Sequence, residues 1–263
     1  MIVARFASGA ITIAPMPKPT LVALPYSPWS EKARWALDHH GIGYVEETYV
    51  PMVGEPWLRV RTRTFSGRVS VPVLITPHGV IFDSLRIARH ADRVGKSETL
   101  FPREHEPAMD AWNADSEEML DAARGLVIGR MKESPGALEE ALPSFVPDTV
   151  RPALRPLARF GASFVARKYD ARGESERIDA ALGRLRSALR GGRDYLFEHF
   201  TYADVTMAVA LQAIKAPEGH LKIGAATRET WTDPMRASRD ADLLAWRDAI
   251  YRKHRVGAAV RAA

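Results

Sequence analysis

A short run of side chains able to hold an anion lies at residues 26–30, which read Tyr-Ser-Pro-Trp-Ser. The preceding segment, residues 20–24, is short, mostly apolar and bounded by turn-forming residues, which predicts a buried strand. After Pro28, apolar side chains recur at positions 29, 33, 36 and 37, which is the spacing of one helical face. A helix N-terminus carries unpaired N–H groups and a partial positive charge, so the hydroxyl of Ser27 is placed to bind an anionic ligand atom.

The serines and the tyrosine of this turn each have a second interpretation. Ser27 also fits the role of a plain N-cap, whose side chain only pairs a backbone N–H of the helix. Tyr26, at the end of the strand, is either a second donor to the same anion or a buried aromatic residue. Ser30 is interpreted as a cap of the helix. The sequence leaves these alternatives open.

Two further segments carry residues of the same kind. A strand is predicted at 71–76, followed by a turn and a second strand at 80–82. Pro72 cannot donate a ladder hydrogen bond, and a proline at the start of a strand is its simplest explanation. Asp83 and Ser84 then open a helix that runs to Gly95, and either residue suits the N-cap.

The order of these segments resembles the glutathione S-transferase superfamily, in which the first strand–helix turn carries the Ser, Tyr or Cys that holds the glutathione sulfur. Residues 27–30 also resemble a glutaredoxin Cys-Pro-aromatic-Cys turn with serine at both cysteine positions. The Val-Pro-Val-Leu segment at 71–74 is similar to the family segment whose proline peptide is cis. At 83–84 the family has an acid or amide followed by serine, and both grip the γ-glutamyl end of glutathione.

The resemblance therefore implies a set of site residues. Ser27 is the expected holder of the thiolate, with Tyr26 as the alternative donor. A cis peptide before Pro72 leaves the N–H and C=O of Val71 free to pair with a peptide-like ligand. The helix N-terminus and the Ser84 hydroxyl suit an α-carboxylate, and the acid at position 83 suits an α-amino group.

This chain departs from the family pattern at two of those positions. The family usually has Glu or Gln where this chain has Asp83, which is one methylene shorter and therefore reaches less far toward an amino group. Many relatives also carry a lysine shortly before the Val-Pro pair, where this chain has Arg68. Arg68 is either a contact for the glycyl carboxylate or a solvated surface charge.

The fold implied by the resemblance is an α/β thioredoxin-like N-terminal domain at 20–97 followed by an all-α C-terminal domain at 103–256, after an N-terminal extension at 1–19. Within the second domain, periodicity predicts helices at 104–131, 150–164, 178–189 and 243–251, and the proline-rich stretch 133–147 suggests a break or lid. Thr201 and Asp204 form a capping box before an apolar helix that should run through the domain centre. The stretch 131–175 has no counterpart in the resemblance.

Composition agrees with two folded domains and excludes several chemistries. The 263 residues are 46% hydrophobic and 26% charged, as in ordinary globular proteins. The chain has no cysteine, which excludes disulfides, thiolate metal sites and a protein thiol nucleophile, so any sulfur chemistry must use a ligand's sulfur. This is consistent with a reducing compartment without requiring one. The eight histidines form no His-Glu-x-x-His pattern, so no metal is expected.

The net charge and the sequence of the N-terminal residues limit which partners are expected. The net charge is +5, but the basic residues are scattered, and only the alternating Arg59, Arg61 and Arg63 hint at a basic stripe, so nucleic acid is not expected. A mild positive field would attract an anionic small molecule. Residues 1–19 have the features of neither a signal peptide nor a membrane span, and Met16 is an alternative start to Met1.

The expected function is that of a glutathione S-transferase-like enzyme. Glutathione is the co-substrate, and its thiolate, held by Ser27, attacks a small hydrophobic electrophile bound against the helical domain. The resemblance also implies a homodimer and a cytoplasmic location. One alternative is a protein of the same fold that binds partners without turnover, which the departures at Asp83 and before Val71 favour. Another is a glutathione-dependent isomerase or dehalogenase.

Overall fold

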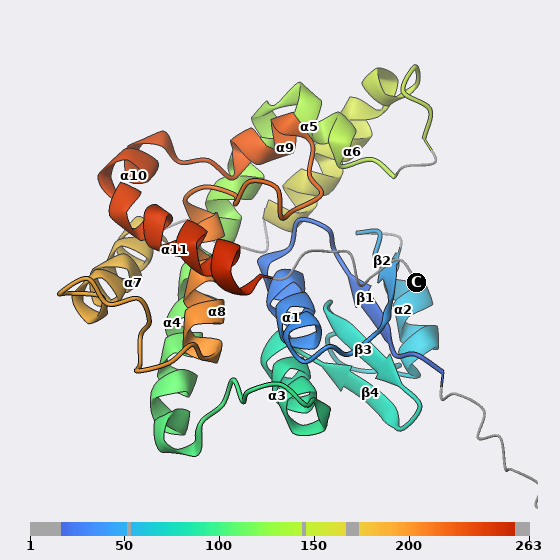
Figure 1. Ribbon diagram of the computed structural model, residues 1–263. Coiled ribbons are helices and arrows are strands. Elements are labelled where there is room, and N and C mark those ends of the chain that lie inside the picture. Colours follow the sequence, from blue (N-terminus) through green and yellow to red (C-terminus); the bar gives the residue numbers. More distant parts are fainter. Residues whose placement is uncertain (1–16, 52–53, 144–145, 167–173, 256–263) are drawn as a thin grey trace, which may run out of the picture.

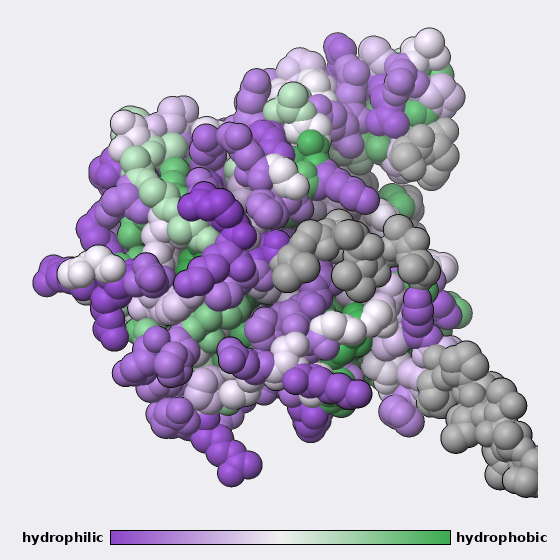
Figure 2. Space-filling view, in the orientation of Figure 1, coloured by the Kyte–Doolittle hydropathy of each residue, from purple (hydrophilic) through white to green (hydrophobic). Residues whose placement is uncertain are grey.

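The computed structural model describes residues 17–51, 54–143, 146–166 and 174–255 (Figure 1). Most of the predicted extension, and with it the choice between Met1 and Met16 as the start, lies outside the described residues. Among the described helices, none combines the length and apolar character that crossing a bilayer requires. Figure 2 shows that the visible surface is mainly hydrophilic, with small apolar areas.

The first half of the chain folds around one sheet with the strand order β2-β1-β3-β4. Its strands are β1 (Thr20–Ala23), β2 (Val45–Thr48), β3 (Val73–Thr76) and β4 (Gly79–Phe82). β1 runs parallel to β2 and antiparallel to β3, which in turn pairs antiparallel with β4. Parallel neighbours need a crossover, and α1 (Pro28–His39) provides it between β1 and β2. This is the thioredoxin-like arrangement that the resemblance implies.

Alternate residues of β1 point to opposite faces of the sheet, and each face has its own cover. Leu21 and Ala23 belong to the main core, together with residues of α1 and of α3 (Ser84–Val94). Val22 points the other way and packs in a small cluster with residues that include Leu58 of α2 (Gly54–Thr62). In Figure 1, α1 and α3 accordingly lie between the sheet and the helical half.

The second half is entirely helical in the described residues. Its α-helices are α4 (Glu106–Glu133), α5 (Pro135–Glu140), α6 (Arg151–Ala166), α7 (Glu174–Ala188), α8 (Tyr202–Ala210), α9 (Ala225–Thr230), α10 (Pro234–Arg239) and α11 (Ala241–His254). Two short 3-10 helices lie at Arg103–His105 and Leu211–Ala213. Every residue of α8 is buried, which confirms the prediction of a central helix behind the capping box.

The structure corrects three details of the sequence prediction. β3 begins at Val73, so Pro72 precedes the strand and does not interrupt its ladder. The stretch 133–147, expected to be a break or lid, contains α5, because Ser134 caps the helix and Pro135 fits its first turn. Val94, whose helical spacing from Ile87 and Ala91 predicts a place on the buried face of α3, is 53% exposed at the last residue of that helix.

Asp204 holds the start of α8 by hydrogen bonds. Its carboxylate accepts from the backbone N–H groups of Leu196 and Thr201, both at 2.8 Å, and from the Thr201 hydroxyl at 3.1 Å. Burial nevertheless raises the pKa of the Asp204 carboxyl to about 6, and these hydrogen bonds offset only part of the rise. An acid whose folded pKa is raised favours folding most where it is protonated.

We therefore expect wild-type protein to gain stability relative to Asp204→Asn as the pH falls from about 7 to about 4. The folded state takes up this proton first, so the contribution is complete below the unfolded pKa of about 3.9 and is lost as the pH rises through about 6. Two pKa units correspond to a gain of about 3 kcal/mol in the free energy of unfolding. Urea unfolding of both proteins across this pH range measures it.

Asp233 provides the matched control for this experiment. Burial alone would raise its pKa, but hydrogen bonds from Arg236 outweigh burial and lower it. Stability from this group is present above the unfolded pKa and lost as the pH falls through the folded pKa. The difference in stability between wild type and Asp233→Asn should therefore change with pH in the opposite direction. The same direction for both variants would contradict the assigned pKa shifts.

Candidate functional site

Ser27 is the N-cap of α1, at the turn that leaves β1. The backbone N–H of Ser30 donates to Ser27 Oγ at 3.4 Å, and Ser27 is only 7% exposed. This bond uses Ser27 as an acceptor and leaves its hydroxyl proton for another partner. The prediction that Ser30 caps the helix is wrong, because Ser30 Oγ instead accepts from the backbone N–H of Leu24 at 3.1 Å and ties the end of β1 to the helix.

Tyr26 precedes Ser27, and burial raises the pKa of its phenol to about 12. The phenol therefore stays protonated at physiological pH and can act only as a neutral donor or acceptor. The Tyr26 backbone C=O accepts a 2.7 Å hydrogen bond from the side-chain amide of Gln212, a buried residue of the 3-10 helix after α8. The sequence analysis missed Gln212, although a lone amide in the apolar stretch 205–214 is a visible signal.

The Val71–Pro72 peptide bond is cis, as the resemblance predicted. Pro72 is buried and Val71 is half-buried. The β1–β3 ladder begins at Val73, which faces Val22, so the sheet does not extend to the backbone of Val71.

Asp83, and not Ser84, caps α3. The carboxylate oxygen Oδ1 of Asp83 accepts from the N–H groups of Leu85 at 2.9 Å and Arg86 at 3.2 Å. The Asp83 backbone has φ 77°, a conformation that residues other than glycine rarely adopt. Ser84 is the first residue of the helix and is 1% exposed, and its hydroxyl has no hydrogen-bond partner among the described residues.

The strand register brings these three segments to one edge of the sheet. The turn with Ser27 leaves the end of β1, where Val22 pairs with Val73 at the start of β3. Val73 also pairs with Phe82 at the end of β4, directly before Asp83. The end of β1, the segment before β3 and the N-terminus of α3 are therefore neighbours. The register does not place Arg68, which is exposed in the loop before Val71 and has no hydrogen bond or ion pair to any described residue.

A buried cation lies beside this edge and was not predicted. Lys32 of α1 is completely buried, and its ammonium donates to the Glu117 carboxylate of α4 at 2.7 Å. The indole N–H of Trp29 donates to the second oxygen of Glu117. Burial lowers the Lys32 pKa, whereas the charges of Glu117 and Asp83 raise it. Its signal in the sequence is its position three residues after Trp29, on the apolar face of the helix.

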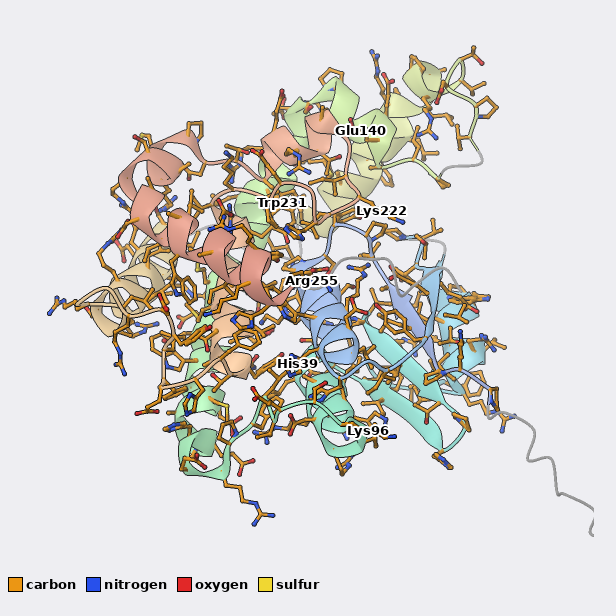
Figure 3. All side chains as sticks on the ribbon, viewed as in Figure 1. His39, Lys96, Glu140, Lys222, Trp231 and Arg255 are labelled. Carbon is orange, nitrogen blue, oxygen red and sulfur yellow. The ribbon has the colours of Figure 1, made fainter. Side chains whose placement is uncertain are left out.

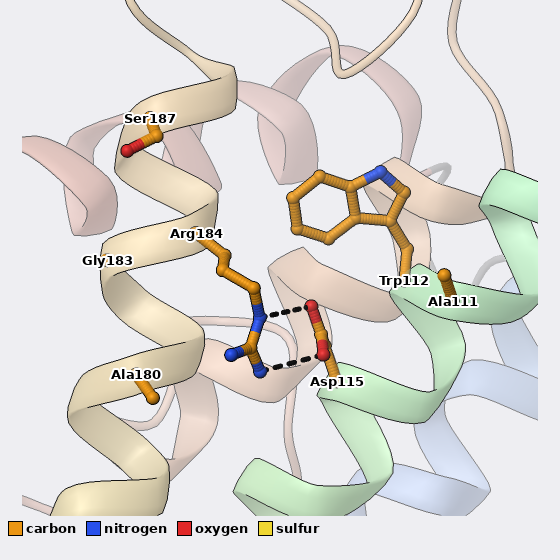
Figure 4. Close-up of a pocket in the computed structure, with 7 residues that line it drawn as sticks. All are labelled: Ala111, Trp112, Asp115, Ala180, Gly183, Arg184 and Ser187. Carbon is orange, nitrogen blue, oxygen red and sulfur yellow. Dashed lines mark hydrogen bonds and ion pairs between the residues drawn. The ribbon is translucent and has the colours of Figure 1, made fainter.

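A groove of about 680 Å³ lies elsewhere, between α4 and α7. It is lined by Ala111, Trp112, Asp115, Ala180, Gly183, Arg184 and Ser187. Arg184 and Asp115 form a two-bond ion pair across it at 2.7 and 2.8 Å (Figure 4). None of the predicted site residues lines this groove, and the described part of the chain contains no group of three or more His, Asp or Glu residues arranged to hold a metal.

Comparison with protein families gives two matches. Residues 26–94 match the glutathione S-transferase N-terminal domain, and residues 170–249 match the glutathione S-transferase C-terminal domain. The first match includes the turn, the cis-proline segment and all of α3. A comparison with curated proteins finds no relative.

Solved structures with the same fold include three glutathione transferases. A glutathione S-transferase from Methylobacterium radiotolerans, in complex with glutathione sulfonate, has a TM-score of 0.59 and 16% identity over 90% of this chain and 91% of that one. A glutathione S-transferase from Methylobacillus flagellatus with GSH bound has a TM-score of 0.54 and 18% identity, and the match covers 90% of this chain and 95% of that one. A glutathione transferase from Phanerochaete chrysosporium has a TM-score of 0.57 and 14% identity, and the match covers 89% of this chain and 98% of that one. At these identities the likeness establishes the fold alone.

Proposed function

Because this chain belongs to the glutathione S-transferase superfamily, we propose that it binds glutathione at the sheet edge and activates its thiol for attack on a small hydrophobic electrophile. The observation that carries the proposal is the strand register, which gathers the Ser27 turn, the cis-proline segment and the N-terminus of α3. The relatives solved with glutathione or its sulfonate support it.

Ser27 is the proposed catalytic residue, with Tyr26 as the second candidate. A free thiol with a pKa of about 8.5 is only about 3% thiolate at about pH 7. Lowering that pKa by about two units requires about 2.7 kcal/mol of preferential stabilisation of the thiolate. A charge-assisted hydrogen bond from Ser27 contributes about 1.5–3 kcal/mol, and the N-terminus of α1 about 0.3–2 kcal/mol. The two together suffice without a general base.

The remaining predicted residues hold the tripeptide in this proposal. The Val71 backbone, set by cis Pro72, pairs with the cysteinyl backbone. The Ser84 hydroxyl and the N-terminus of α3 receive the γ-glutamyl carboxylate. The two backbone N–H groups that donate to Asp83 both do so at Oδ1. We therefore assign the α-ammonium group of glutathione to Oδ2. Arg68 takes the glycyl carboxylate.

Titration calorimetry with glutathione tests the binding step, with S-methylglutathione as a control that keeps the peptide contacts and lacks the ionisable thiol. An ultraviolet titration of the bound thiolate tests activation. We expect the thiol pKa to fall by about two units on binding. A bound thiol with the pKa of free glutathione would contradict activation, and no binding of either ligand would contradict the whole proposal.

A protein that binds glutathione without turnover is the second candidate function. The shorter Asp83 and the arginine at position 68 are the departures that favour it. A panel of aryl halides, epoxides and peroxides separates the two, since glutathione binding without turnover of any electrophile would favour the non-catalytic protein. Isomerisation or dehalogenation by the same thiolate is the variant within the enzyme class.

We also propose a cytoplasmic homodimer whose chains each fold as domains at 20–97 and 103–256. Exposed apolar side chains on the first domain, Trp57, Val60 and Phe65, and the groove in Figure 4 on the second are surfaces available to a second copy. Light scattering should give twice the mass of one chain, and Phe65→Asp should shift the protein toward the monomer. A single-chain mass for the wild type would contradict the dimer.

A further inference from the structure

Two buried hydroxyl groups without partners lie next to each other where the two halves of the protein meet. Tyr202, the first residue of α8, is completely buried, and Ser84, the first residue of α3, is 1% exposed. Neither hydroxyl completes a hydrogen bond with any described residue. The Ser84 hydroxyl is nevertheless near enough to the Tyr202 phenol to lower its pKa, which burial raises. Buried polar groups are rarely left unpaired, so this pair needs an explanation.

The ring of Tyr202 is held firmly in place. It stacks on Phe101 with the ring centroids 4.8 Å apart, and its backbone N–H donates to the Leu100 C=O at 2.9 Å. Among the groups that act on the pKa of its phenol are Asp83 and Ser84, both at the N-terminus of α3, and Glu117 of α4. The side chain therefore comes from the helical half and ends at the sheet edge.

The chemistry of the two hydroxyls is complementary once an anion is present. A carboxylate at the N-terminus of α3, a helix of 11 residues, accepts from the Ser84 O–H. The Ser84 oxygen then has lone pairs for a donor, and the Tyr202 O–H can supply that donor. Such a chain fixes the rotation of the Ser84 hydroxyl and directs its proton at the ligand, and each bond polarises the next.

We propose, on the basis of the function proposed above, that Tyr202 is a positioning residue that orients the Ser84 hydroxyl toward the γ-glutamyl carboxylate of glutathione. Tyr202 touches Ser84 and not the ligand. Burial keeps the phenol pKa well above its ordinary value, so Tyr202 remains a donor across the working pH range. The binding site for this carboxylate is thus formed by residues from both halves of the chain.

Calorimetry on the full-length protein tests this with two probes, glutathione and 4-aminobutyryl-cysteinyl-glycine, which lacks only the α-carboxylate. We expect Tyr202→Phe to weaken glutathione binding by about five- to tenfold, the effect of one hydrogen bond. The analogue should bind wild type and variant alike. In a Ser84→Ala background, Tyr202→Phe should cause no further loss, because the chain is already broken.

Thermal unfolding of the ligand-free proteins separates positioning from a structural role. Since the phenol has no partner in the free protein, Tyr202→Phe should melt at the wild-type temperature or above it. Tyr251→Phe is the matched control, because Tyr251 of α11 is also buried with an unpartnered hydroxyl. This control should change neither the melting temperature nor the affinity for glutathione.

Three results would overturn the inference while leaving the proposed function intact. These are an equal loss of affinity for both probes, additive losses with Ser84→Ala, and a Tyr202→Phe protein that is destabilised or fails to fold. Absence of glutathione binding by the wild type would instead overturn the proposed function, and this inference with it.

Discussion

We expect Ser27→Ala to lower kcat/KM for glutathione conjugation by about 10- to 150-fold, which corresponds to the loss of a charge-assisted hydrogen bond of about 1.5–3 kcal/mol. The hydroxyl proton of Ser27 is not used by its capping bond to Ser30, so it is free to stabilise the thiolate. Without it the bound thiol should titrate closer to the pKa of free glutathione. Steady-state kinetics and the thiolate titration measure the two effects together.

Two variants separate this chemistry from the folding role of the same residue. Loss of the N-cap alone costs about 0.5–2 kcal/mol of stability, so Ser27→Thr, which keeps both hydroxyl and cap, should retain most of the activity. Ser30→Ala is the matched control, because it removes the hydroxyl that binds Leu24 N–H in the same turn. An equal loss in Ser30→Ala would show that the turn alone matters. A loss confined to Tyr26→Phe would make Tyr26 the donor.

The second large effect is expected at Arg255, which follows α11 and lies against α1 (Figure 3). Its guanidinium donates to the Glu31 carboxylate at 2.7 Å and to the Asp38 carboxylate at 2.6 Å. The side chains of all three are at most 7% exposed. Replacing Arg255 by methionine keeps the apolar stem and leaves two carboxylates buried without this cation. We expect a loss of about 3–5 kcal/mol in the free energy of unfolding, measured in urea.

The neighbouring Arg252 gives the control for that measurement, since it is exposed on the last turn of the same helix. Arg252→Met should change stability by less than about 0.5 kcal/mol. If loss of the cation beside these two buried carboxylates is the cause, adding Glu31→Gln and Asp38→Asn to Arg255→Met should restore part of the loss. No restoration, or equal losses in the two arginine variants, would contradict the explanation.

Local signals predicted most of the fold. Periodicity and capping residues located α1, α3 and α8, because each helix carries its apolar face and its cap within a few residues. The six-residue helices α5, α9 and α10 were missed, since so short a segment shows hardly two turns of periodicity. The thioredoxin-like class of the sheet came from the family resemblance, and its strand order from the structure, because strand pairing joins residues far apart in the chain.

The candidate site was predictable only in part, for the same reason. Ser27, Pro72 and Ser84 stand in recognisable local motifs. The bond from Gln212 to Tyr26 joins residues 186 positions apart, and that from Lys32 to Glu117 joins residues 85 apart. Nothing local in a single sequence specifies such partners. Even within the turn, the assignment of Ser27 as the cap depended on which hydroxyl accepted from an N–H group of the helix, since Ser30 instead accepts from the N–H of Leu24 at the end of β1.

The contacts of Gln212 and Glu117 with the first half have a consequence for engineering. Both side chains come from the helical half and hold groups on or next to the turn that carries Ser27. A chimera that joins residues 20–97 to the helices of a distant relative would lose both partners at once. Recombination should therefore require that positions 117 and 212 be transplanted along with the sheet, together with Arg255, whose guanidinium binds Glu31 and Asp38 of α1.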